Sequence, residues 1–198
     1  MKILHDGLLR SMARDGMIKP FFEENVSEVR KPISNGLSSF GYDATLGTEF
    51  REMRRDLPSG TVIDPLAMTP EQIDDLFTTT NAESYDIPPG SYVLGHSIET
   101  FRIPDTVLGL CLGKSSYARL GIIVNVTPLE PGWEGQVTVE ISNHAPYSVR
   151  VHAGYGISQF VFLDNDVPPQ RSYKQRGAKY HGQRGVVLPR FGVVDEKS

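Results

Sequence analysis

Short stretches in which hydrophobic and polar residues alternate make up most of the second half of the chain. Six of them follow one another from about Ser91, separated by Gly, Pro, Asn and Asp: residues 91–104, 106–112, 121–127, 135–142, 148–154 and 157–163. Such alternation predicts β-strands, and strands at this spacing without long helices between them are typical of a β-sandwich or a β-barrel. The expected fold class is therefore mainly β.

Two short helices are predicted in the first half of the chain. Residues 7–15 carry Leu and Met side chains at helical spacing. Residues 69–77 start with Thr69 in the N-cap position and Pro70 at the first helical position, where proline favours a helix. Residues 34–47 are rich in Gly and Ser and are interpreted as a loop that leads into a strand. We thus expect a short N-terminal helix and few other short helices.

The composition restricts the class of protein. The 198 residues suit one domain spanning residues 1–198, and the net charge of -4 gives no reason to expect nucleic acid or a membrane surface as a partner. The start of the chain has no sustained apolar signal segment, and no apolar run approaches the ~20 residues of a membrane span. Because Cys111 is the only cysteine, a reducing, cytoplasmic location is expected. The polar residues 165–198 are interpreted as a flexible C-terminal arm.

The stretch "LCLGKSSYARLGIIV", residues 110–124, looks like the end of a phosphate-binding loop. A P-loop needs two glycines separated by four residues ahead of Lys-Ser and a helix in an α/β sheet, whereas here Gly109 stands one residue too close and the surroundings are β. We therefore reject the P-loop. Lys114 and Arg119 could still pair with phosphate oxygens, and serine hydroxyls could donate to them. The alternative is a turn with a solvated lysine and a structural arginine.

Glu140 lies in a predicted strand whose polar face it shares with other polar residues. In "GQVTVEIS", residues 135–142, apolar side chains alternate with polar ones, so Glu140 points away from the apolar face. The prolines and glycines of "NVTPLEPGWEG" predict a turn that brings this strand back toward residues 121–127. Glu140 could then lie near Ser115 and Arg119 and serve as a general base. The alternative is an ordinary solvated glutamate.

Three separated motifs resemble one known family. They are "GKSSYARLGIIVNVTPLEPGWEGQVTVEISN", "SQFVF" and "SYKQRGAKYHGQRGVVLP". Together they are similar to the dCTP deaminases, a branch of the dUTPase-related superfamily. The resemblance implies a distorted β-barrel of the dUTPase-like type, which assembles as a homotrimer with active sites between neighbouring subunits. It also implies hydrolysis of the 4-amino group of dCTP to give dUTP and ammonia, which feeds dUMP and dTTP synthesis, with Mg²⁺ accompanying the triphosphate.

The same resemblance assigns roles to individual residues. Glu140 would activate the water that attacks C4 of cytosine, Arg119 would keep that carboxylate ionised and in position, and Ser115 would help to hold the water. The nucleotide-binding residues that the resemblance implies are Lys114, Ser115, Ser116, Tyr117, Ala118, Arg119, Thr138, Val139 and Gln159, together with Tyr173, Lys179 and Gln183 of the arm that closes over the triphosphate.

The residue inventory bears on the type of chemistry. Zinc-dependent base deaminases use an H-x-E and a P-C-x-x-C motif, whereas this chain has a single cysteine and no H-x-E. We therefore predict chemistry at C4 without zinc and without any metal held by protein side chains.

Three further expectations concern function. Glu130 in "TPLEPGW" stands where related diphosphatases have an aspartate, so a bifunctional enzyme that converts dUTP further to dUMP and pyrophosphate is one alternative. A non-catalytic regulator that binds pyrimidine nucleotides is another. In addition, dTTP is a possible inhibitor.

Overall fold

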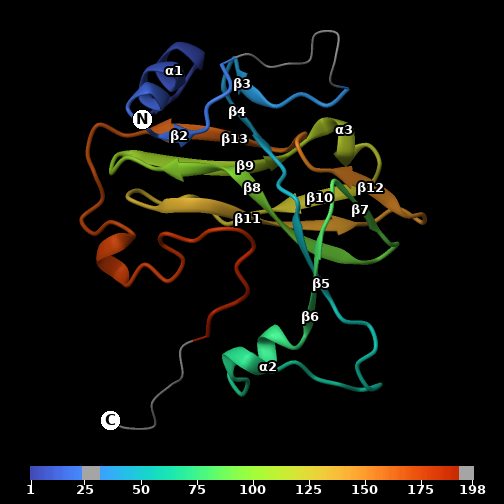
Figure 1. Cartoon of the computed structure of the whole chain (residues 1–198). Helices are drawn as coiled ribbons and strands as arrows, with labels where there is room; N and C mark the ends of the chain where they lie inside the picture. Colours follow the sequence, from blue (N-terminus) through green and yellow to red (C-terminus); the bar gives the residue numbers. More distant parts are fainter. Residues whose placement is uncertain (24–31, 192–198) are drawn as a thin grey trace, which may run out of the picture.

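The computed structural model describes residues 1–23 and 32–191, and it confirms a mainly β chain with a short N-terminal helix (Figure 1). Its strands pair antiparallel in two larger sheets and one two-stranded sheet. Within the described residues this pairing leaves the sheets separate, so that the distorted barrel consists of packed sheets without one continuous ring of hydrogen bonds.

The five-stranded sheet has the order β1 (Lys2–Ile3), β13 (Gly156–Asp164), β4 (Gly41–Thr45) and β3 (Gly36–Ser38), with β9 (Val107–Gly113) also paired to β13. The six-stranded sheet has the order β10 (Ile122–Asn125), β11 (Glu134–Asn143), β8 (Tyr92–Arg102), β5 (Glu49–Met53) and β6 (Phe77–Asn81), with β2 (Ile18–Lys19) also paired to β8. The two-stranded sheet joins β12 (Val149–His152) and β7 (Ser84–Ile87).

The helices are short. They are α1 (Asp6–Arg14), α2 (Pro70–Asp74), α3 (Ser115–Ala118) and a 3-10 turn at Lys174–Arg176. The start of α2 follows from its predicted cap, because the Thr69 hydroxyl accepts a hydrogen bond from the Gln72 backbone N–H at 3.3 Å while the Gln72 side chain accepts one from the Thr69 backbone N–H at 2.9 Å. None of the helices within the described ranges is long and apolar enough to cross a membrane.

The two larger sheets share one core of buried apolar side chains. Phe101 of β8 packs on Phe160 of β13 with 5.1 Å between ring centroids, which joins the six-stranded sheet to the five-stranded one. On β11 the buried side chains alternate with half-buried polar ones, as the sequence pattern predicts. Since the apolar side chains of β11 face the core, Glu140 is on its opposite, outward face.

Candidate active site

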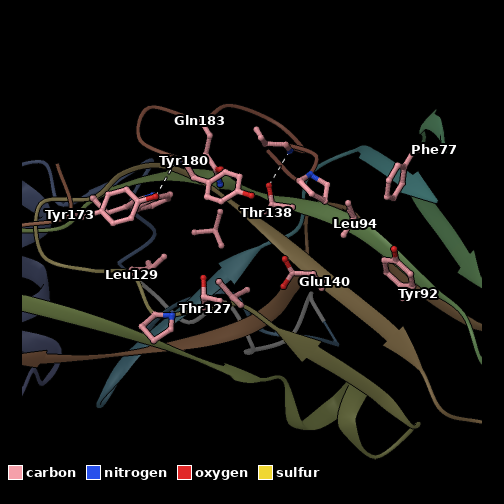
Figure 2. A pocket seen from close by; sticks show the side chains of 16 residues that line it. Phe77, Tyr92, Leu94, Thr127, Leu129, Thr138, Glu140, Tyr173, Tyr180 and Gln183 are labelled. Carbon is pink, nitrogen blue, oxygen red and sulfur yellow. Dashed lines mark hydrogen bonds between the residues drawn. The ribbon is translucent and has the colours of Figure 1, made fainter. Parts of the chain in front are cut away.

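A cavity of about 370 Å³ lies against the outward face of β11 (Figure 2). Its wall comes from strands β6, β8 and β11, from the segment that follows β10, and from the C-terminal arm. The lining residues are Phe77, Tyr92, Leu94, Val126, Thr127, Pro128, Leu129, Trp133, Val137, Thr138, Glu140, Tyr173, Tyr180, Gln183, Val187 and Pro189. Among the described residues that line the cavity, Glu140 is the only carboxylate, and none is Lys, Arg or His.

Glu140 is held in the cavity by its place in the sheet. It is directly opposite Leu94 of β8 on one side and Asn125 of β10 on the other. The Asn125 side chain donates a hydrogen bond of 3.4 Å to one Glu140 oxygen. Burial raises the pKa of Glu140, and no Lys or Arg within the described residues forms an ion pair with it. The described part of one chain therefore provides the carboxylate but no cation that pairs with its charged form.

Aromatic and apolar side chains flank Glu140. Figure 2 shows Phe77, Tyr92 and Leu94 on one side of it, and Leu129 with Tyr173 on the other. Burial raises the pKa of Tyr92, and the charge of Glu140 raises it further. Such walls suit a flat, weakly polar ring beside the carboxylate.

The C-terminal arm covers the cavity from the side opposite Glu140 in Figure 2. The arm lies along β11, where the Gly182 N–H donates to the Glu134 carbonyl at 2.7 Å and the Val187 N–H donates to the Thr138 hydroxyl at 3.1 Å. The Tyr180 N–H donates to the Tyr173 hydroxyl at 2.9 Å, which closes the arm on itself.

Of the predicted arm contacts, the structure places Tyr173 and Gln183 in the cavity lining. It places Lys179 outside, with its ammonium 5.6 Å from the Tyr180 ring centroid and 5.3 Å from that of Phe191. Residues 192–198 of the predicted arm lie outside the described residues.

The segment from Lys114 to Arg119 forms α3 and its caps, and none of its residues lines the cavity. Four of these residues are exposed: Ser115, Ser116, Ala118 and Arg119. Tyr117 is buried, and its hydroxyl accepts a hydrogen bond of 3.2 Å from the His152 N–H. Within one chain, the structure therefore does not bring Ser115 and Arg119 to Glu140.

Lys114 is engaged inside the protein. Its ammonium pairs with the Asp43 carboxylate and donates to the Ser34 hydroxyl at 2.7 Å. The side chains of Lys114 and Asp43 are only 11% and 3% exposed. The ammonium of Lys114 thus forms a buried ion pair with Asp43, which connects the turn before α3 to β4.

Two other predicted contacts lie outside the cavity lining. The Gln159 side chain, on β13, donates to the Ser38 hydroxyl at 3.2 Å, and Val139 is fully buried on the core side of β11. Thr138, by contrast, lines the cavity. One chain thus assembles Glu140, Thr138, Tyr173 and Gln183 and keeps the remaining predicted residues apart from them.

Sequence reasoning missed the aromatic side of the cavity. Phe77 and Tyr92 come from strands β6 and β8, far from the motifs around Glu140 in the chain. Strand pairing is the feature that would have placed Tyr92 near Glu140, because Tyr92 of β8 is directly opposite Ser142 of β11. This pairing becomes visible only once the sheet order is known.

The fold and the cavity define a mainly β protein with one partly buried carboxylate among aromatic walls. The chain matches the family described as dCTP deaminase-like over residues 3–165, and it belongs to that family. This confirms the resemblance noted from its motifs.

Individual relatives agree with this assignment. The chain is 50% identical over 192 residues to the dCTP deaminase of Granulibacter bethesdensis, covering 96% of this chain and 100% of that protein. It is 46% identical over 194 residues to the dCTP deaminase of Thiobacillus denitrificans. Among solved structures, the 2'-deoxycytidine 5'-triphosphate deaminase from Agrobacterium tumefaciens matches with a TM-score of 0.61 at 20% identity, over 82% of this chain and 46% of that longer chain. That structure supports the fold.

Proposed function

We propose that the protein hydrolyses the 4-amino group of dCTP and releases dUTP and ammonia. The observation that carries this proposal is the position of Glu140, a half-buried carboxylate in a cavity with aromatic walls. The relatives named dCTP deaminase, which match nearly the whole chain, support the choice of substrate.

In the proposed reaction, one carboxylate accepts a proton from water and then donates it to the cytosine ring. Ionised Glu140 takes a proton from water as the water oxygen bonds to C4 of the cytosine ring, and it delivers that proton to N3. The C4–N bond then breaks, the amino group leaves as ammonia with a proton from the added hydroxyl, and C4 becomes a carbonyl. General acid–base assistance of this kind contributes typically ~10²–10⁴-fold to the rate. Fixing the water and the ring at attack distance contributes the remainder.

Glu140 must be ionised to begin, and burial in a single chain opposes that state. In the proposal, a neighbouring copy of the chain supplies Arg119, together with Ser115, so that the active site lies between subunits of a homotrimer. The exposed position of both side chains supports this arrangement. Exposed apolar side chains near them on β9, on β10 and after α3 also support it, because they offer a surface that a second copy would cover: Leu110, Leu112, Leu120 and Ile123.

A mixing experiment tests the shared site. The Glu140→Gln and Arg119→Ala proteins are each expected to be inactive. After subunit exchange, some mixed sites combine wild-type Glu140 from one copy with wild-type Arg119 from another, so dCTP deamination should reappear. If labelled subunits demonstrably exchange and activity stays absent, the two residues do not act across a subunit boundary.

The metal in the proposed reaction belongs to the substrate. Within residues 1–23 and 32–191 there is no group of three or more His, Cys, Asp or Glu side chains that could hold a metal ion. In the proposal, Mg²⁺ arrives on the triphosphate and reduces its charge. The proposal also includes a cytoplasmic location and inhibition by dTTP. Saturation curves for dCTP, measured with and without dTTP, test the inhibition. Unchanged kinetics would show that dTTP does not inhibit the enzyme.

The nature of the products separates this function from its alternatives. Glu130, the candidate base for diphosphate release, lies outside the Glu140 cavity, with its carboxylate 4.0 Å from the Arg176 guanidinium. Glu130 is also one methylene longer than the aspartate of the related diphosphatases, and the resulting displacement of its carboxylate favours release of intact dUTP. Incubation with dCTP and Mg²⁺, followed by chromatography, should give dUTP and ammonia. Formation of dUMP and pyrophosphate would indicate the bifunctional enzyme, and unchanged dCTP that nonetheless binds would indicate a regulator.

A further inference from the structure

Gln136 of β11 joins the arm to the body of the protein. Its side-chain oxygen accepts a hydrogen bond of 2.7 Å from the Gly185 N–H, and its side-chain nitrogen donates one of 3.1 Å to the Ile98 carbonyl of β8. Its backbone N–H donates to the Gln183 carbonyl at 3.0 Å, and its carbonyl accepts from the Gln183 side chain at 2.7 Å. One residue thus makes four hydrogen bonds, three of them to the arm.

Neighbouring side chains extend this attachment along the arm. The N–H groups of three consecutive arm residues each donate to a side chain of the body: Gly185 to Gln136 at 2.7 Å, Val186 to Glu49 at 3.4 Å and Val187 to Thr138 at 3.1 Å. Side-chain acceptors from β5 and β11 therefore hold a stretch of arm that has no continuous strand partner of its own.

The arm side of the attachment depends on a glycine. Gly185 has a φ of +61°, and a Cβ atom there would lie 2.6 Å from a carboxylate oxygen of Glu49. A larger residue would have to adopt a disfavoured backbone conformation, and the Glu49 side chain would have to move away from the arm residue it contacts.

The attachment is placed where it controls the cavity. Gln136 precedes Thr138 and Glu140 on the outward face of β11 but does not line the cavity itself. The arm residues on either side of its partner Gly185, namely Gln183 and Val187, do line it. A substitution that breaks the hydrogen bond between Gln136 and Gly185 would therefore loosen the arm residues that cover Glu140. It would leave the Glu140 carboxylate itself unchanged.

We propose that Gln136 is a positioning residue: it fixes arm residues 183–187 over the nucleotide and thereby sets the affinity for substrate, while taking no part in the chemical step. The kinetic part of this inference rests on the proposed function. The structural part, that the side chain of Gln136 holds the arm, can be measured on the protein without substrate.

The test replaces Gln136 by leucine, which keeps the side-chain volume and removes both side-chain hydrogen bonds. The matched control is Gln170→Leu, at an exposed position outside the cavity lining. Hydrogen–deuterium exchange of the free protein should become faster in residues 183–187 of the Gln136→Leu protein only. The KM for dCTP should rise about tenfold, on the scale of one or two lost hydrogen bonds, with kcat changed by less than about twofold.

Other outcomes are decisive as well. Unchanged exchange in residues 183–187 would overturn the positioning role, and so would a fall in kcat at constant KM. Should the Gln136→Leu protein not fold, Gly185→Ala strains the backbone at the arm end of the same contact and must reproduce the faster exchange and the raised KM. If the wild-type protein released no ammonia from dCTP, the proposed function would fail, while the exchange measurement would still decide whether Gln136 holds the arm.

Discussion

Replacing Glu99 by glutamine is expected to change how the stability of the protein depends on pH. Glu99 is on β8, 0% exposed, within the core between the two larger sheets. Its carboxylate accepts hydrogen bonds from the Tyr42 hydroxyl at 3.3 Å and from the Thr45 N–H at 3.0 and 3.2 Å. These bonds do not offset the loss of water, and burial raises the pKa of Glu99 from the ordinary 4.5 to about 7.

The size of the effect follows from the two pKa values. The pKa of Glu99 is about 7 in the folded protein and 4.5 as the ordinary value for the unfolded chain, so the folded protein binds this proton more tightly. The contribution of this group to the free energy of unfolding is therefore fully present below pH 4.5 and is lost as the pH rises through about 7. At 1.36 kcal/mol per pKa unit the total loss is about 3 kcal/mol, and roughly 2 to 3 kcal/mol of it falls between pH 5 and 8.

Urea unfolding at pH 5 and pH 8 measures this loss, at one fixed protein concentration because the proposed assembly would also contribute to stability. The wild type should lose roughly 2 to 3 kcal/mol more than the Glu99→Gln protein between the two pH values. The exposed Glu83→Gln protein serves as the control and should follow the wild type. Equal pH dependence in the wild type and the Glu99→Gln protein would refute the reasoning about burial.

Three further results are expected. The Arg119→Ala substitution should raise the pKa of Glu140, followed by NMR titration of its ¹³C-labelled carboxyl group, because burial then acts without an opposing cation; an unmoved pKa would contradict the role of Arg119. Lys114→Met should lower the free energy of unfolding by ~3–5 kcal/mol, since it removes the ammonium that pairs with the buried Asp43 carboxylate, and urea unfolding that shows a negligible loss would rule this out. Deaminase activity should survive a zinc-specific chelator at constant Mg²⁺, and loss that only zinc restores would disprove the zinc-free reaction.

Local patterns were sufficient to predict the strands from β8 onward and the orientation of Glu140, whereas β3 and β4 occupy much of residues 34–47, which were interpreted as a loop leading into a strand, and β5 to β7 were not predicted. In residues 136–142 of β11, polar and apolar residues alternate, so the sequence alone indicates which of these side chains face the core. The start of α2 could also be predicted from Thr69, because the hydrogen bonds of its cap join residues only three positions apart in the chain. Features that depend on neighbours in the chain can be predicted in this way.

Features that join distant segments could not be predicted. Lys114 was expected at a phosphate, but its partner is Asp43 of β4, and this pair exists only because the fold brings the turn before α3 to that strand. The aromatic wall contributed by Phe77 and Tyr92 depends on the order of strands in the six-stranded sheet. The predicted proximity of Arg119 to Glu140 is not present in one chain, and the contact between copies that we propose instead would leave no pattern within a single sequence.

The most direct measurement compares the wild type and the Glu140→Gln protein with dCTP and Mg²⁺, following nucleotide binding and ammonia release separately. Glutamine keeps the size of the side chain and its hydrogen bonding in the cavity but cannot accept a proton from water at neutral pH. We predict that the variant binds dCTP with nearly unchanged affinity and that its release of ammonia falls by at least ~10²-fold. Ammonia release near the wild-type rate would show that Glu140 is not the base.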